Sequence, residues 1–458
     1  LFEIESGVNS MKIFITGATG FIGTRMAKDL SDRGHTLICL VRKTSNIRAL
    51  ENIGAVPFWG DVCDRRSLKP GMSGCDALIH LAAATSFWEQ DRESYSLTNV
   101  NGTRNVMECA VEAGIPRVVH MSALSVYGRP VQRPFNETST VGPVRFSEYA
   151  RTKYEAERIA WGLHAKKDLP LVVCYPAVAL GAGRRAGGTS FIGRLVGALS
   201  VSRAFLNSIH TFVHVQDVAE AVSRILDREF PIGQRYFIAG ERLSIRRLLA
   251  MVEETSGRKL PRSSVSIPSA RIVGTTLTAV AGITRKPPLM GLSSDYLATL
   301  REGLAADGGK AVRELGMTYT PISAAVSEEV SEMDAEGLLS DKRRARRYPL
   351  GLEIAYRAQG DDGPMRGYVL NISESGMYII TRKPYPRGRY ISANLSPNRP
   401  GGYFMARGRV VRATAGGIAV DFSHRDGSIR DLIEELGKYP HASAPVADAT
   451  RSRAAPEA

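Results

Sequence analysis

The sequence has few cysteines and no long apolar run. The five cysteines of the 458-residue chain stand at positions 39, 63, 75, 109 and 174, and no two form a CxxC pair. A scattered, odd set predicts reduced thiols and no metal site. No apolar stretch reaches the ~20 residues that cross a bilayer, so we predict no membrane span. The cysteine pattern favours the cytoplasm.

Acidic residues are also few. The chain has 46 Asp and Glu against 60 Lys and Arg, a formal net charge of +14. Residues 341–458 hold 20 Lys and Arg and 12 Asp and Glu, so +8 of that charge lies in the last quarter. The excess predicts an anionic partner for the C-terminal part, with a solvated basic surface as the alternative. The length predicts two or three domains.

The most informative stretch is KIFITGATGFIG at 12–23. Its apolar run 13–15 predicts a buried parallel strand, which ends in three glycines before a helical pattern. Gly17 allows a tight strand-to-helix turn, Gly20 allows close approach of a pyrophosphate, and Gly23 allows the helix to pack on the strand. The turn and helix N-terminus therefore predict a dinucleotide-binding site.

Four further strands are expected at 35–41, 55–60, 77–84 and 117–121. Strands that alternate with helices predict an α/β fold with a doubly wound parallel sheet. The strand 35–41 ends in Arg42-Lys43, with no acidic residue to bind a ribose hydroxyl. This favours NADP over NAD, although a surface basic pair explains the same residues.

Tyr149 and Lys153 stand four residues apart in a helix expected at 149–163. That spacing places both side chains on one face. A neighbouring ammonium favours the phenolate and so lowers the pKa of a tyrosine. The pair predicts proton exchange between Tyr149 and a carbonyl or alcohol.

Together these motifs resemble the extended short-chain dehydrogenase/reductase family across residues 11–335. The matching pieces are TGATGFIG at 16–23, GDV at 60–62, HLAA at 80–83, NVNGT at 99–103, SALSVYG at 122–128, YARTK at 149–153, FVHVQDVAEAV at 212–222 and, more loosely, ELGMTYTP at 314–321. The resemblance implies a Rossmann-like domain with a small C-terminal substrate lobe.

The resemblance also implies roles for individual residues. Tyr149 would be the catalytic acid/base, and Lys153 would hold the nicotinamide ribose. The implied cofactor-binding residues are Gly17, Thr19, Gly20, Phe21, Ile22, Gly23, Arg42, Asp61, Val62, Leu81, Ala82, Ala83, Asn101, Tyr149, Lys153 and Pro176.

The chain departs from the family pattern at two positions. The usual catalytic Ser or Thr, four residues before the Tyr of the Tyr-Gly pair, is Ala123 here. Ser122 and Ser125 flank it, and Ser122 is the candidate replacement; the alternative is weakened or lost activity. Many members carry an Arg immediately before the Pro that corresponds to Pro176, and this chain has Tyr175 there. Any role that needs an Arg at this position is therefore not expected here.

Substrate class is signalled by residues 258–297. They are more similar to the hydroxysteroid dehydrogenase and dihydroflavonol reductase branch than to sugar-nucleotide epimerases. We therefore expect an oxidoreductase acting on a bulky apolar ketone or alcohol. A sugar-nucleotide epimerase or dehydratase, and a non-catalytic dinucleotide-binding effector, stay open as alternatives.

The pattern changes after a linker at 336–347. Short strands separated by Gly, Pro and Asp turns predict a small antiparallel β-barrel within 348–437. The expected strands are 352–358, 365–371, 377–381, 390–395, 404–411 and 418–422, with a helix at 428–436 and a disordered tail at 438–458.

Arg343-x-x-x-Arg347 and Asn371-x-Ser373-x-x-Gly376 resemble the PilZ family across residues 341–437. The implied ligand is cyclic di-GMP, a bacterial second messenger, which would place the chain in a bacterial cytoplasm. Arginine pairs with phosphate and guanine edges, while Gly376 permits a close or left-handed backbone. We expect the messenger to regulate the enzyme and expect no nucleic-acid partner; a homodimer stays open.

Overall fold

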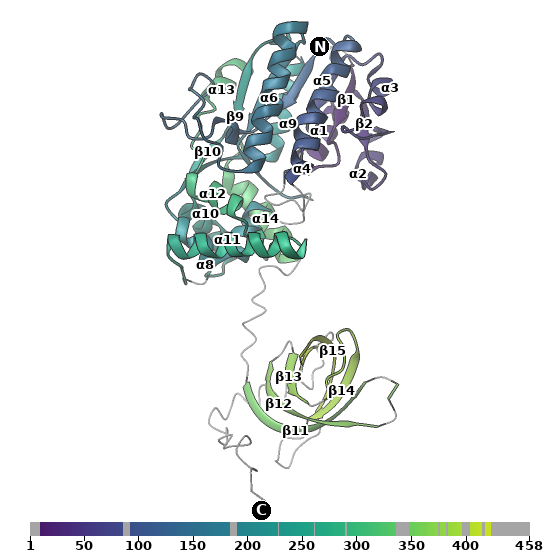
Figure 1. The fold of residues 1–458 in the computed structure, drawn as a ribbon, viewed down its shortest axis with the longest axis vertical. Helices are drawn as coiled ribbons and strands as arrows, with labels where there is room; N and C mark the ends of the chain where they lie inside the picture. The colour runs from purple at the N-terminus through teal and green to yellow at the C-terminus, as the bar shows by residue number, and fades with distance from the viewer. Residues whose placement is uncertain are drawn as a thin grey trace, which may run out of the picture. The chain divides into compact units, whose positions relative to one another are not determined.

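The structure is a computed structural model that divides into two compact units, residues 1–339 and 340–458 (Figure 1). It describes residues 10–335 apart from 86–91, 184–189, 228, 261 and 289–290, and residues 348–422 apart from 359, 362, 374–375, 382, 396–403 and 415–416. Each unit is treated by itself below.

A seven-stranded parallel sheet forms the centre of the first unit. Its strands are β1 (Lys12–Thr16), β2 (Thr36–Val41), β3 (Val56–Trp59), β4 (Ala77–His80), β5 (Val118–Met121), β6 (Leu171–Pro176) and β9 (Arg235–Ile238). Their order in space is β3-β2-β1-β4-β5-β6-β9. The strand order reverses between β1 and β4, where the carboxyl ends of a doubly wound sheet open to a ligand. The predicted fold class is confirmed.

Helices cover both faces of this sheet. The main ones are α1 (Phe21–Asp32), α5 (Gly102–Glu112), α6 (Glu148–Lys167) and α9 (Val215–Asp227). Helix α1 packs against α9, and α5 packs against α6. The shorter elements are α2 (Arg48–Glu51), η1 (Arg65–Ser67), α3 (Lys69–Met72), α4 (Arg92–Tyr95), the π-helix η2 (Ser96–Asn101), η3 (Leu124–Tyr127) and α13 (Gly309–Leu315).

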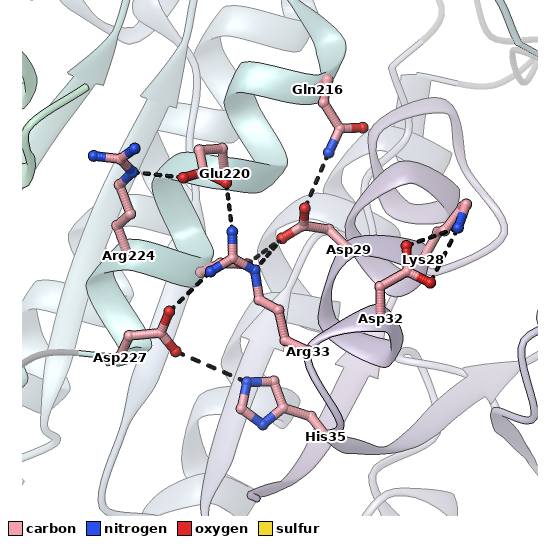
Figure 2. Close-up of polar contacts among 10 residues, drawn as sticks. Lys28, Asp29, Asp32, Arg33, His35, Gln216, Glu220, Arg224 and Asp227 are labelled. Carbon is pink, nitrogen blue, oxygen red and sulfur yellow. Dashed lines mark hydrogen bonds and ion pairs between the residues drawn. The ribbon is translucent and has the colours of Figure 1, made fainter. Parts of the chain in front are cut away.

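An ion-pair network holds the C-terminal end of α1 against α9 (Figure 2). The guanidinium of Arg33 contacts Asp29 at 2.8 Å, Glu220 at 2.5 Å and Asp227 at 3.0 Å. Gln216 of α9 also donates to Asp29, at 3.0 Å. Because one fork of donors binds carboxylates of both helices, the orientation of α1 is fixed at the end opposite its glycine turn.

A smaller lobe follows the sheet. It holds the strands β7 (Val178–Leu180), β8 (Ile209–His214) and β10 (Glu241–Ser244) in the order β10-β8-β7. Its helices are α7 (Phe191–Gly197), α8 (Leu199–Ser202), η4 (Arg203–Phe205), α10 (Ile245–Ser256), α11 (Ile267–Thr284), α12 (Ser294–Glu302) and α14 (Ile322–Ala335). The lobe has its own apolar core, separate from that of the sheet.

The second unit is a closed antiparallel barrel. Its strands are β11 (Tyr348–Ala358), β12 (Met365–Ser373), β13 (Gly376–Ile380), β14 (Tyr390–Leu395), β15 (Phe404–Thr414) and β16 (Gly417–Asp421). They close in the order β11-β12-β13-β16-β15-β14 around an apolar core. All six predicted strands are present, and β11 and β15 are longer than expected. The helix expected at 428–436 and the tail at 438–458 lie outside the described residues.

Candidate functional site

The glycine turn after β1 has the geometry that its spacing predicts. Gly17 adopts φ +77°, a left-handed conformation that favours glycine. The N–H of Gly20 donates to Gly17 O at 3.0 Å and closes the turn. A Cβ on Gly23 would lie 2.1 Å from Gly17 O, so only glycine lets α1 pack this closely. The first turn of α1 has no acidic side chain, which suits an anion at the positive end of the helix.

A second turn lies directly against the first. The N–H of Leu81, just after β4, donates to Thr16 O at 3.1 Å, and that of Ala82 donates to Thr16 Oγ1 at 3.2 Å. A Cβ on Gly17 would lie 2.7 Å from Ala82 N. The structure therefore brings together the Gly17 and Leu81–Ala83 segments at the switch point. Thr16, which sequence reasoning missed, fastens one turn to the other.

The other expected cofactor residues line the same edge of the sheet. Thr19, Phe21 and Ile22 are partly buried at the start of α1, and Pro176 ends β6. Asp61 Oδ1 accepts from Cys63 N at 2.9 Å and shapes the loop after β3.

The remaining expected cofactor residues differ in how far they are exposed to solvent. Val62 is buried against Gly102, whereas Arg42 is exposed at the end of β2. Asn101 is exposed as well, whereas its neighbour Asn99 is buried. Asn99 Nδ2 donates to Thr152 Oγ1 at 3.0 Å, and its Oδ1 accepts from Ala84 N at 2.7 Å. Asn99 thereby ties the segment after Ala83 to α6.

Helix α6 carries Tyr149 and Lys153. The helix begins after Ser147, whose Oγ accepts from Ala150 N at 3.1 Å. Lys153 is buried and its Nζ donates to Met121 O at 2.6 Å, which places the ammonium at the carboxyl end of β5. Burial lowers the pKa of Lys153 to about 8. The two residues therefore lie on the face of α6 that meets the sheet edge.

The pKa of Tyr149 moves against the sequence expectation. Burial raises it to about 12, whereas Lys153 was expected to lower it. The physical reason is that burial removes the phenol from water and so disfavours its charged form. In this state Tyr149 is a phenol that can give a proton.

Glu157, one helical turn beyond Lys153, accepts hydrogen bonds from two hydroxyl groups near Ala123. Its carboxylate accepts from Ser122 Oγ at 2.6 Å and from Tyr175 OH at 2.6 Å. Tyr175 is fully buried. Ser125 is buried and its Oγ has no partner among the described residues. Sequence reasoning missed Glu157, although its spacing from Lys153 puts both on one face.

The loop after β7 is held by three carboxylates of α14. Gly181 N donates to Glu329 at 3.1 Å and Ala182 N donates to Glu328 at 3.0 Å. Gly183 N donates to Glu332 at 3.1 Å.

The same loop reaches the start of α1. Arg25 of α1 donates to Ala182 O at 3.0 Å, and a Cβ on Gly183 would lie 3.4 Å from the ring of Phe21. The loop 181–183 therefore joins α14 to the helix that begins at the glycine turn.

The barrel positions one of the two expected messenger-binding motifs. Asn371 and Ser373 are described only as backbone positions of β12, where the register shifts between Val369 and Asn371. Gly376 begins β13 and pairs with Ser373. A Cβ on Gly376 would lie 2.2 Å from Val420 O, so the close approach is observed, without a left-handed backbone. Arg343 and Arg347 lie outside the described residues.

Two parts of the chain match known protein families. Residues 13–239 match the model of the NAD dependent epimerase/dehydratase family, and residues 341–436 match that of the PilZ domain. The chain is 31% identical over 334 residues to sterol demethylase protein B of Methylococcus capsulatus, a match that covers 72% of this chain and 100% of the relative. The chain belongs to the NAD dependent epimerase/dehydratase family.

Two further matches support this assignment. The 4-hydroxy-2-methyl-3-oxo-4-farnesyl-3,4-dihydroquinoline-1-oxide ketoreductase of Stigmatella aurantiaca is 31% identical over 319 residues, covering 67% of this chain and 91% of the relative. The crystal structure of gox2253 superposes with a TM-score of 0.60 at 29% identity, covering 72% of this chain and 100% of that one. The epimerase/dehydratase-family part is thus joined to a PilZ domain in one chain.

Proposed function

We propose that this family member is an NADP-dependent oxidoreductase that reduces an apolar carbonyl compound and is regulated by cyclic di-GMP. The observation that carries the reaction is the placement of Tyr149 and Lys153, with Lys153 bonded to Met121 O at the carboxyl edge of the sheet. The names of the two relatives, a sterol demethylase protein and a ketoreductase named for a farnesyl-substituted quinoline oxide, favour an apolar substrate over a sugar nucleotide.

The residues at the switch point fit a dinucleotide. A side chain on Gly17 would collide with Ala82 N, and one on Gly23 would collide with Gly17 O, so glycine at both positions keeps the turn tight. The backbone N–H groups at the start of α1 would then bind the pyrophosphate. Exposed Arg42 at the end of β2 would pair with a 2′-phosphate. When bound, the dinucleotide supplies the hydride for the carbonyl carbon.

The protein supplies the proton. Tyr149, with its pKa raised to about 12 by burial, is protonated at neutral pH and would donate to the carbonyl oxygen. Lys153, with a pKa lowered to about 8, would hold the ribose and stabilise the phenolate that remains. Because Ser122 is bonded to Glu157, Ser125 is the hydroxyl better placed to hold the substrate oxygen.

The test is Tyr149→Phe in the full chain. We measure NADPH oxidation with a panel of apolar ketones and NADPH affinity by fluorescence titration. Loss of the proton donor should lower turnover by about 10²- to 10⁴-fold with NADPH affinity unchanged. Tyr154→Phe, a partly buried tyrosine on the same helix, is the matched control and should keep turnover. Turnover unaffected by Tyr149→Phe would contradict the proposal.

Regulation is proposed because α14 contacts the loop 181–183 and also precedes the Arg343–Arg347 motif in the chain. Its carboxylates hold the loop 181–183, and the helix ends at Ala335, eight residues before Arg343. Messenger binding at Arg343 and Arg347 would pull on the last turn of α14 and so bias the loop beside α1. Replacing Glu328 and Glu332 by Ala removes the acceptors for Ala182 N and Gly183 N. In fluorescence titrations this variant should bind NADPH and cyclic di-GMP separately, with no effect of one ligand on the affinity for the other.

A further inference from the structure

Helix α11 has an outward face that no other described residue of the first unit covers. Ile272 is 67% exposed and Ile283 is 83% exposed, whereas Ala270 of the same helix is fully buried. Val280 and Ile267 are each about half exposed as well. The opposite face of the helix is packed, because a Cβ on Gly274 would lie 2.4 Å from Leu297 of α12. The exposure is therefore confined to one side.

The exposed residues form a continuous stripe. Residues 272, 276, 279 and 283 recur at intervals of four, three and four, so their side chains lie on one face of the helix. Ile272, Ala279 and Ile283 give this stripe an apolar character, Thr276 is its one polar member, and Val280 flanks it. Figure 1 shows α11 crossing the end of the lobe that is remote from the seven-stranded sheet. We name residues 272, 276, 279, 280 and 283 the α11 stripe.

The charge around the stripe has one sign. Between Glu254 and Asp295 the chain has six Lys or Arg and no Asp or Glu. Arg258 and Arg262 of this stretch pair with Asp334 and Glu253. Arg271, Arg285 and Lys286, which adjoin the stripe, are exposed and form no ion pair within the described ranges.

An apolar stripe bordered by unpaired cations complements an anionic lipid surface. Acyl chains receive the Ile and Val side chains while anionic headgroups pair with the Arg and Lys side chains. A protein partner with a matching apolar face would have to bring its own acidic rim. Within the described residues no helix is both long and apolar enough to cross a bilayer, so α11 would lie in the interface.

We propose that α11 docks this protein on an anionic lipid surface. The stripe enters the headgroup region, and Arg271, Arg285 and Lys286 contact lipid phosphates. This inference is independent of the proposed reaction, because the stripe shares no residue with the Tyr149 site.

The experiment is flotation of the full chain with vesicles of phosphatidylcholine alone and with roughly 30% phosphatidylglycerol added. The wild type should float with the anionic vesicles and should be released by added salt. Replacing both Ile272 and Ile283 by Asp should weaken this binding by at least about tenfold. Ile232→Asp changes an apolar residue that is 53% exposed elsewhere on the same unit, and it should bind as the wild type does.

Three results would overturn the proposal. The wild type could fail to bind either vesicle, or the double variant could bind as tightly as the wild type. Alternatively, the wild type could self-associate in light scattering while the double variant is monomeric and neither binds lipid, which would assign the stripe to a second copy of the chain. NADPH affinity of each variant reports that the fold is intact and separates this outcome from failure of the reductase proposal.

Discussion

The glycine turn and the corner around Ala123 lie on the same edge of one sheet but are built differently. At the glycine turn the proposed ligand-binding groups are backbone N–H groups, and the glycines let the turn pack closely against Ala82 and α1. At the Ala123 corner each group is a side chain with a protein partner: Lys153 bonds Met121 O and Ser122 bonds Glu157. A site built from backbone groups can be predicted from residue spacing in the sequence. A site built from side chains depends on contacts between segments that are distant in the sequence.

The largest effect should come from the backbone site. Gly23→Ala places a Cβ 2.1 Å from Gly17 O, so α1 must move away from the turn and NADPH binding should be lost. Gly162→Ala is the matched control, because Gly162 lies inside α6 with nothing within 4 Å of a new Cβ. The control should bind NADPH and gain up to about 1 kcal/mol of stability. Fluorescence titration and thermal unfolding measure both, and normal binding by Gly23→Ala would contradict the geometry.

The two serines beside Ala123 separate a structural from a catalytic hydroxyl. Ser122→Ala removes a donor from buried Glu157 and should cost about 1–3 kcal/mol of stability, with turnover changed little. Ser125→Ala leaves every described hydrogen bond intact and should lower turnover more than stability. Denaturant unfolding and steady-state kinetics of both variants decide the matter. A large loss of turnover in Ser122→Ala at unchanged stability would restore Ser122 as the catalytic hydroxyl.

The pH dependence of reduction should report Lys153. Its pKa is lowered to about 8 by burial, so raising the pH through 8 removes the ammonium proton, while Tyr149, at about 12, keeps its own. We expect kcat/KM for reduction to be constant below that pH and to fall about tenfold per unit above it. A profile that stays flat to pH 10 would show that the ammonium charge is not needed.

The smallest expected effect concerns cofactor choice. Arg42→Ala should weaken NADPH about five- to tenfold, ~1–1.4 kcal/mol, because one charge-assisted contact at an exposed position is lost. NADH affinity should not change. Arg48→Ala, a neighbouring exposed arginine in α2, serves as the control. Equal weakening of both nucleotides by Arg42→Ala would argue against a 2′-phosphate contact.

The sequence predicted what local patterns determine. The strand-turn-helix around Gly17, the parallel sheet and all six barrel strands followed from apolar runs, turn residues and glycine spacing. It could not reveal that Glu157 draws Ser122 and Tyr175 inward, because these three residues come from different elements. The rise in the pKa of Tyr149 was missed for a similar reason, since burial depends on the whole lobe.

The most direct test of a messenger-regulated dinucleotide enzyme is NADPH affinity of the full chain with and without saturating cyclic di-GMP. Coupling between two sites is typically 1–3 kcal/mol, so we predict a shift of roughly 5- to 150-fold. Replacing Arg343 and Arg347 by Ala should abolish the shift and leave affinity for NADPH alone unchanged. Identical NADPH affinity in the presence of bound messenger would contradict the account.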